Sequence, residues 1–125
     1  MKDSILTEKA PRPVGPYSQA VRAGGFVFVS GQLPLDPVSG TMPDSVQEQA
    51  AQSMRNVGAV LEKAGLSFAD VVKTTVFLAD IADFPAVNAV YASFFCEPFP
   101  ARSCFAVKSL PSAAKVEIEV IAAES

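Results

Sequence analysis

The feature that most constrains the fold of this chain is a change of hydrophobic period near its middle. Between residues 45 and 65 apolar residues recur at steps of three and four, whereas residues 71–79 form one β-branched and apolar run. The first spacing places an apolar stripe along one side of a helix, and the second favours a central strand that is dry on both faces. A one-sided helix beside such a strand predicts packed layers of helix and sheet. The helical stripe consists of Val46, Ala50, Met54, Val57, Leu61 and Ala64.

Local signals mark where two helices are expected to begin and end. Ser45, with Glu48 three residues later, forms a capping box, and Gly65 is placed to end the first helix. A second helix is predicted over residues 84–95, with Asp83 as its cap. Residues 1–17 end in a Pro/Gly-rich segment and are expected to form an extended arm, and the proline-rich residues 33–43 a loop.

Short apolar runs on either side of these helices predict four more strands. They cover residues 18–23 and 26–30, joined at Gly24-Gly25, and residues 102–108 and 115–122, joined by a turn at 110–112. The expected fold is α+β, a mixed β-sheet with two helices on one face, in a single domain of residues 1–125. Strands that a helix connects are expected to be parallel.

The alternation of strand residues predicts an uncovered apolar face. Successive side chains point to opposite faces of a sheet, and the two helices cover only one of those faces. An exposed apolar sheet face usually marks a partner surface, so we expect the chain to self-associate. The apolar strand residues that cannot all lie under the helices are Val27, Val29, Val72, Val76, Phe105, Val107, Val116 and Val120.

Composition narrows the chemistry that is open to the chain. The sequence contains no histidine, which removes Ser-His-Asp triads, His-paired cysteine nucleophiles and most catalytic zinc sites. Its ten basic residues are dispersed and its net charge is −3, so no nucleic-acid partner is expected. Cys96 and Cys104 fit no metal or redox motif and predict reduced thiols in a cytoplasmic protein. No window has the length of a membrane span, so no membrane association is expected.

Arg102 is the residue that most suggests a binding site. It begins an otherwise uncharged strand, where a guanidinium is costly unless an anion meets it, and its planar fork matches a carboxylate. Alternation places Cys104 on the same face as Arg102 and Ser103 on the opposite face. The competing interpretation of Arg102 is a structural salt bridge or a snorkelling arginine at a strand end.

The other polar candidates are individually unspecific. Glu117 and Glu119 share a face with Lys115, which is typical of a solvated edge, although a glutamate near Arg102 would be able to handle a water proton. The pattern does not choose between the two glutamates. The remaining candidates, each with an ordinary structural interpretation as well, are Tyr17, Ser30, Gly31 and Asn88.

Together, five segments resemble the Rid family (YjgF/YER057c/UK114) over essentially the whole chain. They read GPYSQA (15–20), VSGQ (29–32), VKTTVF (72–77), VNAVY (87–91), and PARSC (100–104) followed by LP (110–111) and VEI (116–118). Within the family the chain is similar to the RidA subgroup, which retains the arginine. The resemblance implies a chorismate-mutase-like fold and a homotrimer whose sheets form a central barrel, with three clefts at the subunit interfaces.

The resemblance also implies a reaction. It is the hydrolytic deamination of reactive 2-imino or enamine acids, such as 2-aminoacrylate and 2-iminobutanoate, to 2-keto acids and ammonia, with no cofactor and no metal. Arg102 would pair with the substrate carboxylate, Glu117 would position the attacking water, and Cys104 would shape the site near the imine carbon. The residues implied to line the cleft, some of them from the neighbouring subunit, are Tyr17, Ser30, Gly31 and Asn88.

Two alternatives stay open from the sequence. The same cleft would hold 2-keto acids or other small carboxylates in a binding protein without turnover. A ribonuclease or translation-inhibitor activity is the other, and the dispersed basic residues and missing histidines argue against it. Residues 95–99 form a shorter connection than in many relatives, which we expect to affect substrate preference.

Overall fold

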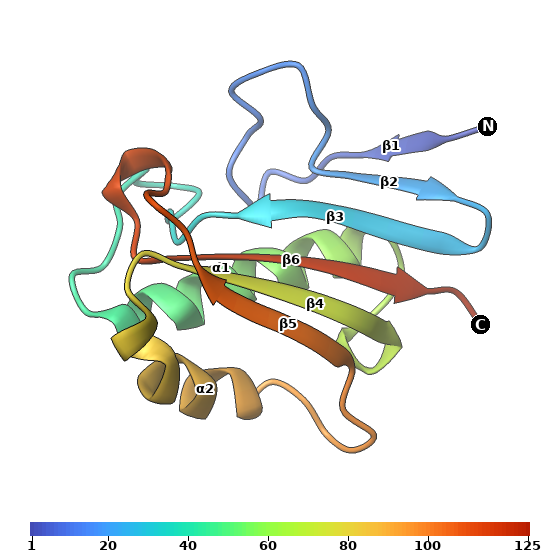
Figure 1. The fold of residues 1–125 in the computed structure, drawn as a ribbon. Coiled ribbons are helices and arrows are strands. Elements are labelled where there is room, and N and C mark those ends of the chain that lie inside the picture. Colours follow the sequence, from blue (N-terminus) through green and yellow to red (C-terminus); the bar gives the residue numbers. More distant parts are fainter.

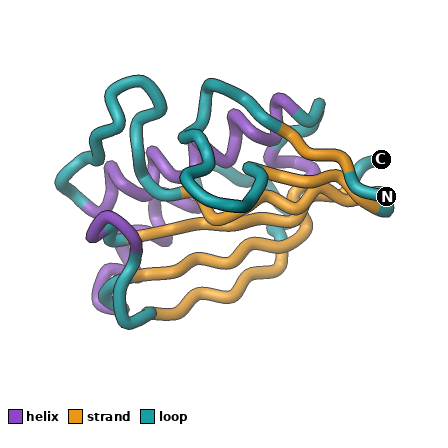
Figure 2. The backbone as a smooth tube through the Cα atoms, turned by 90° about the horizontal axis from the view of Figure 1, so that it is seen from above, coloured by secondary structure: helices purple, strands orange, loops and turns teal.

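The computed structural model describes all 125 residues and contains one six-stranded sheet with the strand order β1-β2-β3-β6-β4-β5. Both α-helices lie on the same side of this sheet (Figure 1), and the edge-on view in Figure 2 shows the two layers. The predicted α+β fold with two helices on one face is confirmed. No helix is both long and apolar enough to cross a membrane. The elements are β1 (Asp3–Ile5), β2 (Ala20–Ala23), β3 (Phe26–Gln32), α1 (Val46–Lys63), η1 (Phe68–Asp70), β4 (Val71–Leu78), η2 (Ile81–Asp83), α2 (Phe84–Ala92), β5 (Ala101–Ala106), η3 (Pro111–Ala113) and β6 (Val116–Ala123).

Strand β4 lies inside the sheet, paired antiparallel with β6 and parallel with β5. Because β3 is also antiparallel to β6, the strands that each helix connects run in the same direction, as predicted. The expectation that both faces of β4 are dry is wrong. Thr74, Val76 and Leu78 are buried beneath the helices, whereas the residues that alternate with them are only partly buried, because this chain supplies no second layer. These residues are Lys73, Thr75 and Phe77.

The helix ends follow the sequence signals only in part. The Ser45 hydroxyl accepts a hydrogen bond from the Glu48 N–H at 3.1 Å, and Gly65 follows the helix with a φ of +80°. Helix α2 ends at Ala92, three residues earlier than predicted, and Asp83 makes no side-chain capping bond. Asp83 is instead the last residue of η2 and already has helical dihedral angles, so its carboxylate cannot reach the first N–H groups of α2. The residue that caps η2 is Asp80.

The N-terminal segment is more regular than the predicted arm. Its residues 3–5 form β1, which pairs antiparallel with β2. The following hairpin turns at Gly24 and Gly25, whose φ values of +59° and +81° suit the expected two-residue turn. The rest of the arm is held by the buried Gln19 amide, which accepts from the Thr7 N–H at 2.7 Å and donates to the Pro11 carbonyl at 2.9 Å.

Replacing this buried amide should loosen the arm. Gln19→Leu is expected to lower the free energy of unfolding by about 1–3 kcal/mol, because it leaves buried backbone groups of the arm unpaired. Trypsin should then cut faster after Lys9, because the carbonyl of the neighbouring Ala10 accepts a hydrogen bond from Gln19 Nε2 in the wild type. Urea unfolding and limited proteolysis measure both effects. The exposed Gln47→Leu is the matched control, and equal behaviour of the two variants would refute the anchoring role.

Candidate functional site

Arg102 lies on the helix side of the edge strand β5. Its register partner in β4 is Thr74, which is fully buried. The guanidinium carbon lies 4.8 Å from the centre of the Tyr91 ring and 5.3 Å from that of Phe84, and Nη1 donates to Asn88 Oδ1 at 2.8 Å. Neither of the two ion pairs in the chain involves Arg102. The interpretation of Arg102 as half of a structural salt bridge is therefore wrong.

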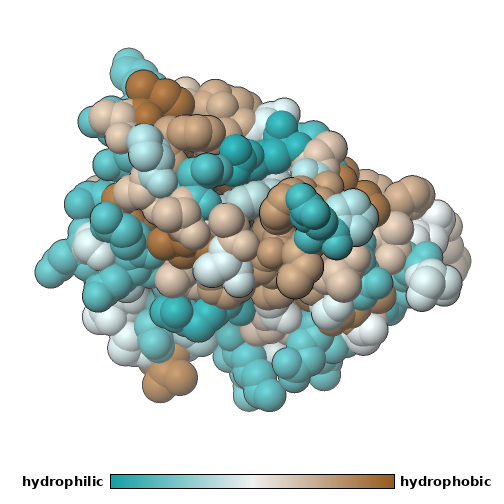
Figure 3. All heavy atoms as spheres, turned by 90° about the horizontal axis from the view of Figure 1, so that it is seen from below, coloured by the Kyte–Doolittle hydropathy of each residue, from teal (hydrophilic) through white to brown (hydrophobic).

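A hollow of about 420 Å³ opens beside the guanidinium. Arginine has five N–H donors, and Arg102 uses one of them within the protein. Its other donors are available to an anion that enters the hollow. Figure 3 shows the side of the molecule on which α2 lies, where separate hydrophobic areas alternate with hydrophilic ones. The hollow is lined by Asn88, Tyr91, Ala92, Phe99, Pro100 and Arg102.

Cys104 shares the face of Arg102, as the alternation predicted. Its register partner Val76 is buried, and the thiol packs against the hydrophobic core. Burial raises the pKa of the Cys104 thiol above its ordinary 9.0, and the Arg102 charge opposes that rise only in part. A thiol that stays protonated is a poor nucleophile, so the Cys104 side chain is better suited to shaping the site than to attacking a substrate. Ser103 faces the other side, where its hydroxyl accepts from Lys73 Nζ at 3.2 Å.

Glu117 lies on the open face of the sheet, against β3. An alanine Cβ at Gly31 would fall 2.7 Å from Glu117 Oε2, so the glycine makes the room that the carboxylate occupies. Next to Gly31, the Ser30 hydroxyl donates to the Ser18 carbonyl at 2.6 Å. Ser18 also borders the surface hollow that contains the half-exposed Tyr17. Four of the predicted site residues therefore lie in this region, namely Glu117, Gly31, Ser30 and Tyr17.

The environment of Glu117 favours its protonated form. Burial raises the pKa of this carboxyl above its ordinary 4.5, and the negative charge of Glu119 raises it further. The folded state therefore holds this proton more tightly than the unfolded chain, and stability should fall as the pH rises above 4.5 through the folded-state pKa. Both glutamates belong to β6, which is an interior strand, so the solvated-edge interpretation is wrong. Lys115 precedes β6, and its Nζ donates to the Asp44 carbonyl at 2.9 Å.

Arg102 and Glu117 do not meet within one chain. The β4 partner of Arg102 is Thr74 and that of Glu117 is Phe77, and residues three apart on a strand point to opposite faces. The structure therefore divides the predicted residues into two groups. The Arg102 group contains Arg102, Cys104 and Asn88, and the Glu117 group contains Glu117, Gly31, Ser30 and Tyr17.

Sequence reasoning missed two aromatic residues of the Arg102 group, Phe84 and Tyr91. Together with Asn88 they follow the spacing i, i+4, i+7, which aligns side chains along one side of a helix. That spacing, read beside the candidate Asn88, was the available signal. Both rings resemble ordinary core residues in the sequence, because nothing there shows that Arg102 lies over them.

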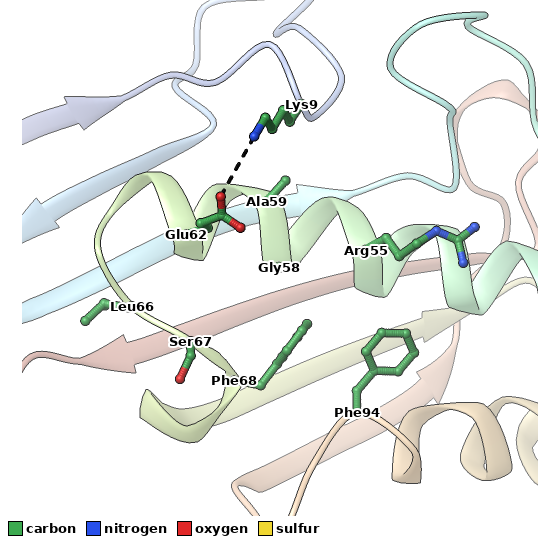
Figure 4. Close-up of a pocket in the computed structure, with 9 residues that line it drawn as sticks. All are labelled: Lys9, Arg55, Gly58, Ala59, Glu62, Leu66, Ser67, Phe68 and Phe94. Carbon is green, nitrogen blue, oxygen red and sulfur yellow. Dashed lines mark ion pairs between the residues drawn. The ribbon is translucent and has the colours of Figure 1, made fainter.

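The largest hollow on the surface, about 530 Å³, contains none of the predicted site residues. Figure 4 shows that it lies against α1, with the rings of Phe68 and Phe94 on one side and the Lys9–Glu62 ion pair on the other. That ion pair spans 3.9 Å between largely exposed side chains. A Cβ on Gly58 would lie 3.0 Å from the Phe68 ring, so close packing of this ring on α1 accounts for the glycine. Nowhere do three or more His, Cys, Asp or Glu side chains group in a way that would hold a metal ion.

Comparison with known families places the fold and these residues in context. The model of the family described as Endoribonuclease L-PSP matches residues 7–124, which is nearly the whole chain. The chain belongs to this family. The predicted resemblance is confirmed, because relatives within the Endoribonuclease L-PSP family bear the names YjgF and RidA.

Relatives of known name and structure cover almost the full chain. A Salmonella typhimurium protein named 2-iminobutanoate/2-iminopropanoate deaminase is 51% identical, with 98% of each chain covered. The structure of Escherichia coli TdcF with bound serine superposes with a TM-score of 0.95 at 47% identity, covering 98% of this chain and 99% of TdcF. The Escherichia coli YjgF gene product gives the same TM-score at 48% identity and the same coverage.

The cause of the raised Glu117 pKa can be tested by titration. We expect carboxyl ¹³C shifts to give a Glu117 pKa above 4.5. Glu119→Gln should lower that pKa by removing a nearby negative charge, and Gly31→Ala should lower it by pushing the carboxyl toward water. Asp36, whose pKa is held below 3.8 by the Ser39 and Val38 N–H groups, is the internal reference. A Glu117 pKa that moves in neither variant would show that neither burial nor Glu119 causes the shift.

Proposed function

We propose that this protein hydrolyses 2-imino acids, in equilibrium with their enamines, to 2-keto acids and ammonia. The observation on which the proposal rests is the Arg102 guanidinium, which opens onto a hollow and has no carboxylate partner. A planar fork of N–H donors binds a carboxylate in two places at once and orients it. Every 2-imino and 2-keto acid has such a carboxylate next to the carbon that reacts.

The names of the relatives support this reaction rather than another use of the same carboxylate clamp, by which we mean the Arg102 guanidinium. Proteins from Salmonella typhimurium and Escherichia coli that are 51% and 50% identical over nearly the full chain bear the name 2-iminobutanoate/2-iminopropanoate deaminase. A structure of TdcF contains serine, an amino acid whose carboxylate and amino group are attached to the same carbon. Both observations favour a small 2-amino- or 2-imino-carboxylate in the site.

The division of the site residues supports a homotrimer with its clefts between subunits. Arg102 lies on the edge strand β5, where a second subunit can approach it, whereas Glu117 lies on the open face. In a closed head-to-tail ring, each interface would bring the Arg102 group of one subunit to the Glu117 group of the next. The same arrangement would cover the exposed apolar residues of the open face, which are Phe26, Phe28 and Phe105.

The proposed chemistry needs one proton acceptor and an oriented substrate. Arg102 would hold the carboxylate, and Glu117 in its ionised form would take a proton from water as the water oxygen bonds to the carbon of the protonated imine and the C=N electron pair moves to nitrogen. The resulting carbinolamine would then lose ammonia. The proton held by Glu117 passes to the departing nitrogen, the C–N bond breaks as the C=O bond forms, and the hydroxyl proton returns to the Glu117 carboxylate. A carboxyl with a raised pKa is suited to both proton transfers near neutral pH.

Two competing functions are weaker than hydrolysis of 2-imino acids. A binding protein for 2-keto acids, without turnover, would use the same Arg102 guanidinium, and Glu117→Gln should then leave its affinity unchanged. Ribonuclease activity, which the family description names, would require a surface that binds phosphates, and the ten basic residues of this acidic chain are dispersed.

Two unpaired cysteines fit a cytoplasmic location.

Removing the clamp should abolish the catalysed part of the reaction. With 2-aminoacrylate generated in the assay by a pyridoxal-phosphate dehydratase, Arg102→Ala is expected to lower kcat/KM about 100-fold, the loss of a charge-assisted pair of hydrogen bonds. Arg102→Lys should recover little, because an ammonium has no planar fork. Keto-acid formation measures the rate, and circular dichroism checks the fold. A folded Arg102→Ala with the wild-type rate would refute the proposed clamp.

Mixed trimers test whether one site draws on two subunits. Arg102→Ala and Glu117→Gln subunits should each be inactive alone, but refolding them together in equal amounts should restore about a quarter of the wild-type activity. Every mixed ring would contain one interface with both groups intact. If Arg102 and Glu117 of the same subunit acted together, no mixing ratio would restore activity.

A further inference from the structure

We propose that Thr74 and Tyr91 form a buried pair that positions the Arg102 guanidinium. Thr74 fixes the Tyr91 ring through a hydrogen bond, and the ring in turn sets the direction of the arginine fork. Neither residue would act on the substrate directly. The inference rests on the proposed function, because it treats Arg102 as the group that binds the substrate carboxylate.

The first step is the contact between the guanidinium and the helix. Arg102 lies over the Tyr91 ring at 4.8 Å, which is within the range of an attractive contact between a cation and an aromatic face. Its Nη1 donates to Asn88 one turn earlier on α2. The Asn88 amide restricts the rotation of the guanidinium, and the Tyr91 ring beneath the guanidinium restricts its tilt. The donors that remain free then face the hollow rather than solvent at random.

The second step is the support of the ring itself. The Tyr91 and Thr74 hydroxyls share a hydrogen bond of 2.8 Å, and both residues are buried. If the ring moved, it would leave two buried hydroxyls without partners, which is costly. Thr74 is also the register neighbour of Arg102 on β4. Thr74 therefore pairs with the Arg102 backbone and at the same time holds the Tyr91 ring that lies under the guanidinium.

The third step separates positioning from packing. Tyr91 also packs on Phe95 at 4.8 Å between ring centres, so its loss would change the core as well as the clamp. Thr74 offers a cleaner change, because it is fully buried and its hydroxyl makes a single side-chain hydrogen bond, to Tyr91. Valine has the same shape and lacks the hydroxyl, whereas serine retains the hydroxyl.

The main experiment compares Thr74→Val with Thr74→Ser in the full-length protein. Thr74→Val is expected to raise KM for the imine, and Kd for the unreactive probe 2-oxobutanoate, by about 3–10-fold, because a misdirected fork binds a carboxylate poorly. Thr74→Ser should restore both values to within about twofold of wild type. Titration calorimetry gives Kd, and urea unfolding reports stability separately. A Thr74→Val that unfolds more easily but keeps KM and Kd would overturn the proposal.

A second measurement tests whether the effect passes through Arg102. In an Arg102→Ala background, Thr74→Val should leave the residual affinity for 2-oxobutanoate unchanged, since the group that it positions is absent. An equal loss of affinity in both backgrounds would show that Thr74 acts independently of the arginine, and would overturn the proposal. The urea unfolding curves show whether Thr74→Val folds. If Thr74→Val does not fold, Tyr91→Leu takes its place as the test variant.

Tyr91→Leu has its own control on the same side of the chain. Phe94→Leu removes a ring that packs on Phe68 and does not touch Arg102. Tyr91→Leu is expected to raise Kd for 2-oxobutanoate by about 2–30-fold, the range of a lost cation–ring contact, whereas Phe94→Leu should change stability alone. Equal Kd values for the two variants would count against Tyr91.

The readouts keep this inference distinct from the proposed function. If wild type binds 2-oxobutanoate with the expected dependence on Thr74 but does not accelerate imine hydrolysis, the positioning stands and the deaminase proposal fails. If wild type is an active deaminase and Thr74→Val leaves KM and Kd unchanged, the deaminase proposal stands and the positioning fails. A wild type that neither binds nor hydrolyses would overturn both.

Discussion

The pairing of β4 with two neighbours fixes where every candidate residue points. The β5 register sets Arg102 beside Thr74 on the helix side, and the β6 register sets Glu117 beside Phe77 on the open side. A slip of one residue would bring the buried Val76 to solvent, so core packing holds this register. The separation of the two charged groups is therefore a property of the folded sheet, and a site that uses both must draw on a second subunit.

Each charged group is stable in a single chain for a different reason. Arg102 keeps its charge at the rim of the sheet, where aromatic faces and the Asn88 amide replace part of its hydration. Glu117 responds to burial by holding its proton, and Glu119 strengthens that tendency. Neither group has a counter-ion within the chain. In the proposed reaction the substrate would supply a carboxylate to pair with Arg102 and an imine to exchange protons with Glu117.

Local patterns in the sequence predicted much of this structure, and they failed where long-range pairing decides. The stripe on α1 and the Gly24-Gly25 turn depend on neighbouring residues, and both were predicted correctly. The faces of Arg102 and Glu117 depend on the insertion of β6 between β3 and β4, which no local pattern shows. The family resemblance named candidate residues without showing which of them lie together. Thr74 was missed because a threonine within a β-branched run looks like an ordinary strand residue.

Buried polar side chains are the means by which this small core orients exposed segments. Gln19 holds the arm that precedes Tyr17, and Asn56 donates to the carbonyls of Leu33 and Leu35 in the long loop after β3. Thr74 holds Tyr91 in the same way, with a hydroxyl in place of an amide. Apolar packing alone would leave such segments several positions of similar energy, whereas an unpaired buried polar atom makes the alternatives costly. Placing these groups at the margins of the core therefore determines the geometry of the surface where the substrate is proposed to bind.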